Sequence, residues 1–176
     1  MTRIRTLAVA VVAATLTTTP LAAQSTASAS LAVTGKVVNP ISLSVTAPLD
    51  FGGMFVGTPK AIAADATGSG RFTVNGEAGA AISVTLQMPT TVSSTGGATI
   101  PLSNWSYVVG STAALTGTSP VSFSPTAGTP ISATLGGSSG VGHLYFGVGA
   151  TASPSATAAN GTYTATGQIT VAYVGM

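Results

Sequence analysis

The sequence predicts an all-β protein, a sandwich built from short strands. Val, Ile, Thr, Tyr and Phe recur in short runs that are separated by Gly, Pro, Ser and Asn, a composition typical of strands and turns. Asn75-Gly76 and Asn160-Gly161 fall between such runs, and their glycines accept the positive φ that tight turns require. Beyond the first residues, no window keeps apolar residues at helical spacing. Many short strands with punctuating turns indicate a sandwich.

The first expected strand alternates most clearly. Leu31, Val33, Gly35 and Val37 fall on one face, which is the period of two of a strand with one buried side. The expected strands are, in chain order, residues 31–38, 41–46, 50–56, 70–75, 80–87, 105–109, 130–135, 141–148 and 162–174. Between the strands at 80–87 and 130–135 the chain is rich in Ser, Thr, Gly and Pro, which predicts long surface loops and weak edge strands.

The N-terminus has the layout of a secretory signal peptide. Arg3 and Arg5 precede an apolar stretch over 7–16, and small residues follow up to Ala23. A membrane-spanning helix needs about twenty apolar residues, and this stretch is too short. We therefore expect a signal peptide over 1–23, cut after Ala23 or alternatively after Ala29, and a secreted chain without a transmembrane anchor. An N-terminal extension over 24–39 and one domain over 40–176 would follow.

Removal of the signal peptide changes the charge of the chain. Two of the five basic residues lie in the leader, and the remaining charges balance. They are Lys36, Lys60 and Arg71 against Asp50, Asp65 and Glu77. The basic isoelectric point of the full sequence therefore belongs to the export signal, and no nucleic-acid partner is expected. The chain has no cysteine, so its stability must come from packing.

The sequence contains few residues of the types that act in catalysis. His143 is the one histidine, and the acids are too scattered to indicate a metal site or a carboxylate pair. Gly136–Gly140 matches G-x-S-x-G, but hydrolases of that kind need an acid between the serine and the histidine, and no acid follows Glu77. We expect a protein that is not an enzyme and that uses no metal or other cofactor.

Trp105 and Tyr107 leave one binding function open. They fall on one face of an expected strand, where exposed aromatic rings can stack on sugars, although core packing is the commoner role. These residues are the candidates for contact with a ligand.

Several motifs together resemble bacterial pilins of the chaperone-usher superfamily. They are Gly35–Asn39, Leu49-Asp50-Phe51-Gly52, Phe72–Gly79, Asn160–Tyr163 and Val171–Tyr173. The chain is also similar to a group of secreted pilin-like domains of unknown function and to spore-coat-type pilin-like proteins. Phe72–Gly79 resembles the central block of that uncharacterised group.

This resemblance implies an immunoglobulin-like sandwich that lacks its last strand and receives one from a neighbour. The donor residues would be Leu31, Val33, Gly35 and Val37. The acceptor groove would be lined by Ile41, Leu43, Val45, Tyr163, Ile169, Val171 and Tyr173. In pilins the donor lies parallel to the first strand, and parallel neighbours need a connection of about a dozen residues or more. Only Asn39-Pro40 separates the extension from the strand at 41–46, so insertion into another copy is expected.

The expected function is that of a structural subunit, polymerised by strand donation into a filament or coat on a bacterial surface. The resemblance implies a homo-polymer, assembled with a periplasmic chaperone and an outer-membrane usher. The alternative is a monomeric secreted module that binds a carbohydrate or a surface ligand through Trp105, Tyr107 and the polar loops.

Overall fold

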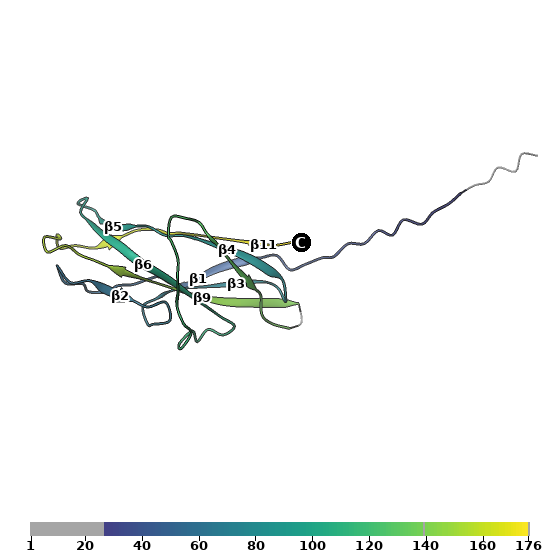
Figure 1. The fold of residues 1–176 in the computed structure, drawn as a ribbon, viewed down its shortest axis with the longest axis horizontal. Coiled ribbons are helices and arrows are strands. Elements are labelled where there is room, and N and C mark those ends of the chain that lie inside the picture. Colours follow the sequence, from purple (N-terminus) through teal and green to yellow (C-terminus); the bar gives the residue numbers. More distant parts are fainter. Residues whose placement is uncertain (1–26, 139, 176) are drawn as a thin grey trace, which may run out of the picture. The chain divides into compact units, whose positions relative to one another are not determined.

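The computed structural model describes residues 27–138 and 140–175 (Figure 1). The predicted signal peptide lies outside these residues. The chain divides into two units, Met1–Gly35 and Lys36–Met176. In the first unit, residues 27–35 contain no strand, and the side chains of Leu31 and Val33 are each 87 % exposed. The second unit carries all the described secondary structure.

The second unit is an all-β sandwich, as the alternating apolar pattern predicts. Its strands are β1 (Ser42–Ala47), β2 (Lys60–Ile62), β3 (Gly70–Glu77), β4 (Ala81–Gln87), β5 (Thr91–Ser94), β6 (Thr99–Gly110), β7 (Val121–Ser122), β8 (Pro130–Thr134), β9 (Val141–Ala152), β10 (Tyr163–Thr164) and β11 (Gln168–Tyr173). The described residues contain no helix capable of spanning a bilayer.

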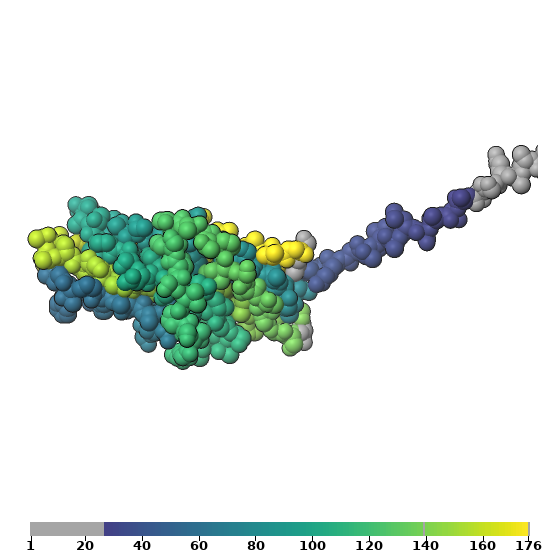
Figure 2. Space-filling view, in the orientation of Figure 1, coloured from purple at the N-terminus to yellow at the C-terminus, as the bar shows by residue number. Residues whose placement is uncertain are grey.

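The strands form two antiparallel sheets. The larger sheet has the order β1-β3-β9-β6-β5-β10, with β2 beside β9 and β7 beside β6, and the smaller sheet has the order β11-β4-β8. Residues 111–129 cross from β6 of the larger sheet to β8 of the smaller one, and they form the green band across the near face in Figure 2. β1 and β11 thus lie at edges of different sheets.

β9 is the central strand of the larger sheet. Residues 141–148 of β9 pair with β3 and residues 150–152 pair with β2, while β6 pairs with residues 145–152 on the other side. The segment that follows β2 crosses close to β9, and a side chain at Gly147 or Gly149 would collide with the carbonyl oxygens of Ala64 or Ile62. Glycine at these two positions lets the backbones approach.

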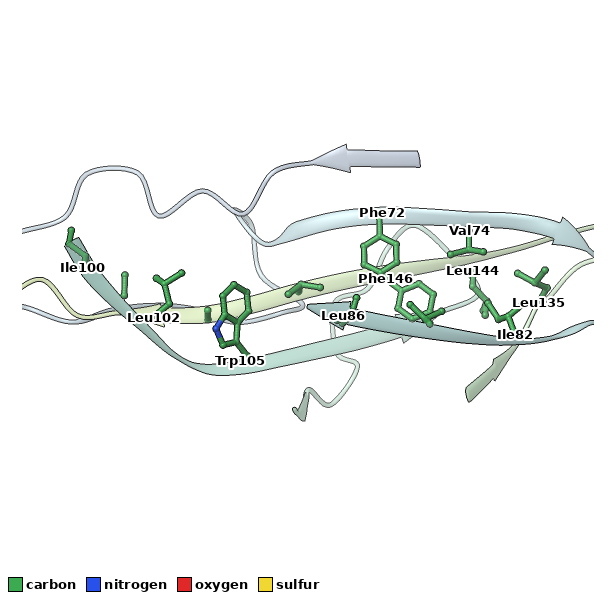
Figure 3. Packing of buried hydrophobic residues seen from close by; sticks show 14 residues of the cluster. Phe72, Val74, Ile82, Leu86, Ile100, Leu102, Trp105, Leu135, Leu144 and Phe146 are labelled. Atoms are coloured by element: carbon green, nitrogen blue, oxygen red, sulfur yellow. The ribbon is translucent and has the colours of Figure 1, made fainter. Parts of the chain in front are cut away.

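The core lies between the two sheets (Figure 3). Phe72 of β3 stacks on Phe146 of β9, with ring centroids 4.7 Å apart. Val84 and Leu86 of β4 close the core from the smaller sheet, and both are at most 1 % exposed. A smaller cluster of Ala64, Val108 and Leu115 packs separately from this core. Sandwich cores of this kind arise because alternate residues of each strand face inward.

Two strand predictions were wrong, and a third was wrong in part. Residues 31–38 and 50–56 contain no strand, and the predicted strand over 162–174 is divided into β10 and β11. The first segment has no strand partner among the described residues, and Gly52-Gly53 interrupts the second. The short strands β2, β5 and β7 were not predicted, since two to four residues give no periodic signal.

Candidate functional site

Two edge strands of the sandwich each have one hydrogen-bonded neighbour. β1 pairs with β3, and β11 pairs with β4. Within the described residues neither strand has a partner on its other side. Backbone N–H and C=O groups of an unpaired edge are available to another strand.

The apolar side chains of β1 point towards the interior, and yet solvent reaches them. In an antiparallel pair, directly opposite residues share one face of the sheet. Leu43 lies opposite Val74 and Val45 lies opposite Phe72, two core residues that are 0 % and 2 % exposed. Leu43 and Val45 are nonetheless 39 % and 65 % exposed. The interior face of β1 is therefore uncovered.

β11 shows the same arrangement from the smaller sheet. Ile169 lies opposite Leu86 and Val171 lies opposite Val84, both of which are core residues. Ile169 and Val171 pack against the core and remain partly exposed. Both edge strands thus direct apolar side chains inward at places where no further strand covers them in the described part of the chain.

A cleft of about 840 Å³ lies between the second half of β1 and the start of β11. Val45 and Ala47 line it from β1, and Ile169 lines it from β11. Its floor is made of core side chains, namely Phe72, Ile100, Leu102, Trp105 and Val148. We call this cleft the β1–β11 groove. An apolar floor between two unpaired strand edges is a surface that an incoming strand can cover.

The remaining sheet edges carry features that discourage strand addition. β8, the other edge of the smaller sheet, begins with Pro130, which cannot donate a backbone hydrogen bond. β10, the other end of the larger sheet, has two residues. Short edges and edge prolines are common protections against unwanted pairing. β1 and β11, with six residues each, have no such protection.

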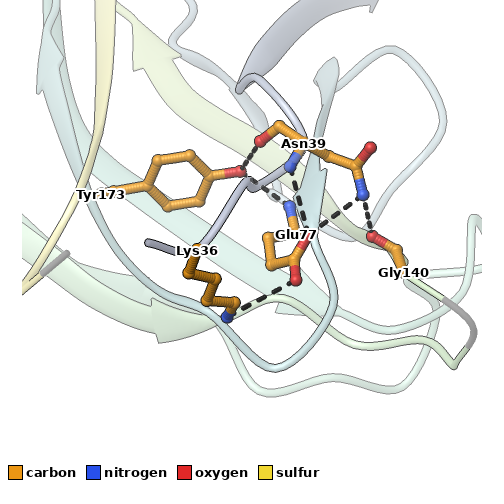
Figure 4. Close-up of polar contacts among 5 residues, drawn as sticks. All are labelled: Lys36, Asn39, Glu77, Gly140 and Tyr173. Carbon is orange, nitrogen blue, oxygen red and sulfur yellow. Dashed lines mark hydrogen bonds and ion pairs between the residues drawn. The ribbon is translucent and has the colours of Figure 1, made fainter. Parts of the chain in front are cut away.

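A hydrogen-bonded cluster around Asn39 bridges the residue before β1 and the last residue of β11 (Figure 4), and we call this side of the groove its closed end. The Tyr173 hydroxyl donates to the Asn39 carbonyl oxygen (2.7 Å) and accepts from the Glu77 amide (2.7 Å). The Asn39 amide and side chain donate to the Glu77 carboxylate at 3.1 and 3.0 Å, and the side chain also donates to the Gly140 carbonyl oxygen. The Asn39 cluster, as we name it, joins both sheets to the residue that precedes β1.

Both the electrostatics and the packing of the Asn39 cluster favour these hydrogen bonds. The hydrogen bond from the Asn39 amide lowers the pKa of Glu77 below its usual value of 4.5, burial opposes this shift, and the Lys36 charge 3.6 Å away adds to it. The Lys36 side chain is 71 % exposed, so its ion pair contributes little stability. A side chain at Gly76 would collide with the Tyr173 hydroxyl, which explains the glycine beside Glu77.

The opposite end of the groove, which we call the open end, is lined by residues 49–54, which follow β1, and by residues 158–167, which include the short strand β10 and precede β11. No hydrogen bond among the described residues joins these two segments. Tyr163 of β10 lines this end, and its hydroxyl donates to the carbonyl oxygen of Ala159, four residues earlier (2.7 Å). The groove therefore has a closed end at the Asn39 cluster and an open end at the loops.

The structure gathers most of the predicted acceptor residues around the groove. Val45, Ile169 and Tyr163 line it, Leu43 and Val171 lie on the inward faces of its two edge strands, and Tyr173 closes it. Ile41 packs against the core just before β1. The predicted donor residues Leu31, Val33 and Gly35 lie in the first unit, and Val37 of the second unit is 98 % exposed.

The alternative function requires exposed rings at Trp105 and Tyr107, and neither side chain is fully exposed. Trp105 is 4 % exposed and belongs to the core, and Tyr107 is half-buried beside Phe123 (ring centroids 6.0 Å). Trp105 therefore has the core role. Its Nε1 atom is buried without a hydrogen-bond partner among the described residues, although Trp105 contributes to the groove floor.

The Asn39 cluster was not predicted as a unit. Asn39, Glu77 and Tyr173 lie far apart in sequence, and three polar residues at such separations give no pattern that a single sequence reveals. The sequence predicts a turn at Asn75-Gly76 beside Glu77, whereas these residues form the end of β3. His143 pairs in register with Asn75, and its ring lies against that of Tyr145, with centroids 5.5 Å apart. Within the described residues, no group of three His, Asp or Glu side chains is placed to hold a metal ion.

Comparison with known proteins places the chain in one family. The model of a domain of unknown function, DUF4402, matches residues 52–173, so the chain belongs to that family. The match covers β2 to β11 and thus most of the groove, but it begins after β1. No curated protein and no solved structure shows significant similarity to the chain.

Proposed function

We propose that this protein is a secreted structural subunit that polymerises by donating its N-terminal extension to the β1–β11 groove of another copy. One observation carries the proposal. Among the described residues, β1 and β11 each have a free edge, and their inward apolar side chains remain partly exposed, above all that of Val45 at 65 %. A strand inserted between β1 and β11 would complete an immunoglobulin-like sandwich. The polymer would form a filament or coat at a bacterial surface, without catalysis.

The extension has the chemistry that the groove needs. Leu31, Val33 and Val37 alternate with polar or small residues, and each is at least 87 % exposed in the single chain. Their burial would contribute roughly 1.5 to 3 kcal/mol per side chain before ordering costs. Ordering the backbone costs about 1 to 2 kcal/mol per residue. Side-chain burial alone therefore does not offset the ordering cost. The remaining favourable free energy must come from backbone hydrogen bonds to both groove edges and from covering Leu43 and Val45.

The direction of insertion follows from the ends of the groove. The folded domain of the donating copy begins at Asn39, immediately after the extension. That domain can lie beside the open end of the acceptor groove, but not beside the end that the Asn39 cluster closes. The C-terminal end of the donor segment therefore lies near Ala47, at the end of β1. The donor thus runs parallel to β1, which is the direction in pilins.

The same geometry disfavours insertion into the chain's own groove. The Asn39 cluster holds the start of the domain at the closed end. A parallel return to the open end needs a connection of about a dozen residues, which the chain lacks. An antiparallel hairpin would require Asn39 to leave Glu77 and Tyr173. Donation to another copy meets neither obstacle.

Size measurements test this proposal directly. We expect the mature chain, from Gln24, to form polymers in light scattering and filaments in electron microscopy. A variant that lacks residues 24–38 is expected to be a folded monomer. A stable monomer that is indifferent to this deletion would contradict the proposal and would support a monomeric binding module instead.

A further inference from the structure

Apart from Val121 on β7, the exposed large apolar residues of the second unit that lie outside β1 gather in two groups, one at each end of β9. Val37, Val141 and Val174 are 98 %, 57 % and 52 % exposed. They surround the Asn39 cluster, because Val37 lies between Lys36 and Asn39, Val141 pairs with Glu77, and Val174 follows Tyr173. We call these three residues the valine patch.

The second group lies at the open end of the groove. Phe55 and Val56 are 79 % and 53 % exposed and stand in the loop before β2. This loop is held in place by Gly57, whose amide donates to the carbonyl oxygens of Pro154 and Ser155 at 3.1 and 3.2 Å. These two partners follow the last residue of β9, whereas Val141 is its first. The two groups thus lie at opposite ends of β9, and β2 and the C-terminus mark these ends in Figure 1.

We infer that the Phe55–Val56 loop of one copy packs against the valine patch of the copy whose extension fills its groove. This inference rests on the proposed function and identifies a second contact in the same polymer. The partner is therefore another copy of this chain, bound end to end.

The length of the connection makes this contact necessary. Only two residue steps separate Val37 from Asn39, and an extended chain spans at most about 3.6 Å per residue, or about 7 Å here. If the donor segment leaves the groove at the open end, the Asn39 cluster of the donor must lie within that distance of the exit. The residues that border the exit, among them Val56, then face the valine patch of the donor.

Exposure supports the same pairing. Large apolar side chains that are more than half exposed usually find a partner when they are grouped on one surface. Complementary contact at the ends would bury both groups and would make successive subunits stiff relative to one another. Strand donation alone would bury Val37 but leave Phe55, Val141 and Val174 in water.

Cross-linking between single-cysteine variants tests the inference, because the chain has no cysteine of its own. Each experiment mixes two purified variants of the mature chain with a short bismaleimide and measures the yield of cross-linked dimer. Phe55→Cys with Val174→Cys reports the end contact, and Val33→Cys with Val45→Cys reports strand donation. Val121→Cys is the matched control for Val174→Cys, since Val121 is 50 % exposed but lies on β7, beside the middle of β6.

We expect dimer from the end pair and from the donation pair, and a several-fold lower yield when Val121→Cys replaces Val174→Cys. A donation cross-link without an end cross-link above the control would overturn the end contact and leave the proposed function intact. The absence of the donation cross-link would overturn the proposed function, and the inference with it.

Discussion

Gly35 is the residue at which the proposed strand donation is most sensitive to a single side chain. It lies on the same face as Leu31 and Val33, and a Cβ at this position meets no atom within 4 Å in the single chain. In a filled groove the same position would face the acceptor backbone, where a glycine permits close approach. A side chain at this position is therefore tolerated in the single chain but would obstruct a filled groove.

Gly35→Leu is expected to abolish polymerisation while leaving the free energy of unfolding of the domain within about 0.5 kcal/mol of the parent. Thr34→Leu, on the opposite face of the extension, is the control and should polymerise normally. Light scattering and chemical denaturation measure the two effects. Normal filaments from Gly35→Leu would refute the role assigned to this glycine.

Tyr173 joins both sheets to the start of the domain through one hydroxyl group. Tyr173→Phe removes the hydrogen bonds to Asn39 and Glu77, and the free energy of unfolding should fall by about 1 to 3 kcal/mol. Tyr163→Phe is the matched control, because its hydroxyl bonds only to a carbonyl oxygen four residues away, and it should cost about 1 kcal/mol or less. Equal losses in the two variants would contradict the special role of Tyr173.

Glu77 makes the Asn39 cluster sensitive to acid. Its pKa is lowered in the folded chain, chiefly by the Asn39 amide, so its carboxylate stabilises the fold at neutral pH. This contribution should be lost as the pH falls below 4.5 and through the lowered pKa. Denaturation curves from pH 7 to pH 3 should show a loss of stability that is smaller in Glu77→Gln, which cannot titrate. Identical pH dependence of parent and variant would rule out this contribution.

At the scale of elements, the two edge strands of the groove are the feature that most needs an explanation. β1 has an alternating pattern that predicts one buried face, and the strand forms where the pattern predicts it. Its inward residues are nonetheless exposed, which the pattern alone does not reveal. Alternation shows which face a strand would bury, but not whether anything in the same chain covers that face.

A charge on the inward face of β1 is expected to block the groove. Val45→Lys should remain folded, because Val45 is 65 % exposed, and should fail to accept a donor, because an unpaired ammonium group would then be buried. Ser44→Lys, one residue away on the outer face, should polymerise like the parent. Size-exclusion chromatography distinguishes these outcomes, and polymer formation by Val45→Lys would contradict the assignment of β1 to the acceptor.

At the scale of the whole molecule, the sequence predicts the all-β sandwich well because strand length and turn residues are local properties. Most of the residues that the resemblance to pilins predicts for an acceptor lie along or beside the groove, although their acceptor role stays a prediction. The Asn39 cluster and the open and closed ends of the groove could not be predicted, since they depend on how Asn39, Glu77 and Tyr173 meet across two sheets. Irregular segments such as 50–56 were mistaken for strands because their composition is apolar.

Peptide complementation tests the central claim most directly. A chain that begins at Asn39 retains the sandwich and the groove and lacks the donor, and a synthetic peptide of residues 27–38 supplies the donor alone. Calorimetry should show one peptide bound per domain together with a raised Tm, and the same peptide with Gly35→Leu should not bind. A folded domain that binds neither peptide would contradict strand donation.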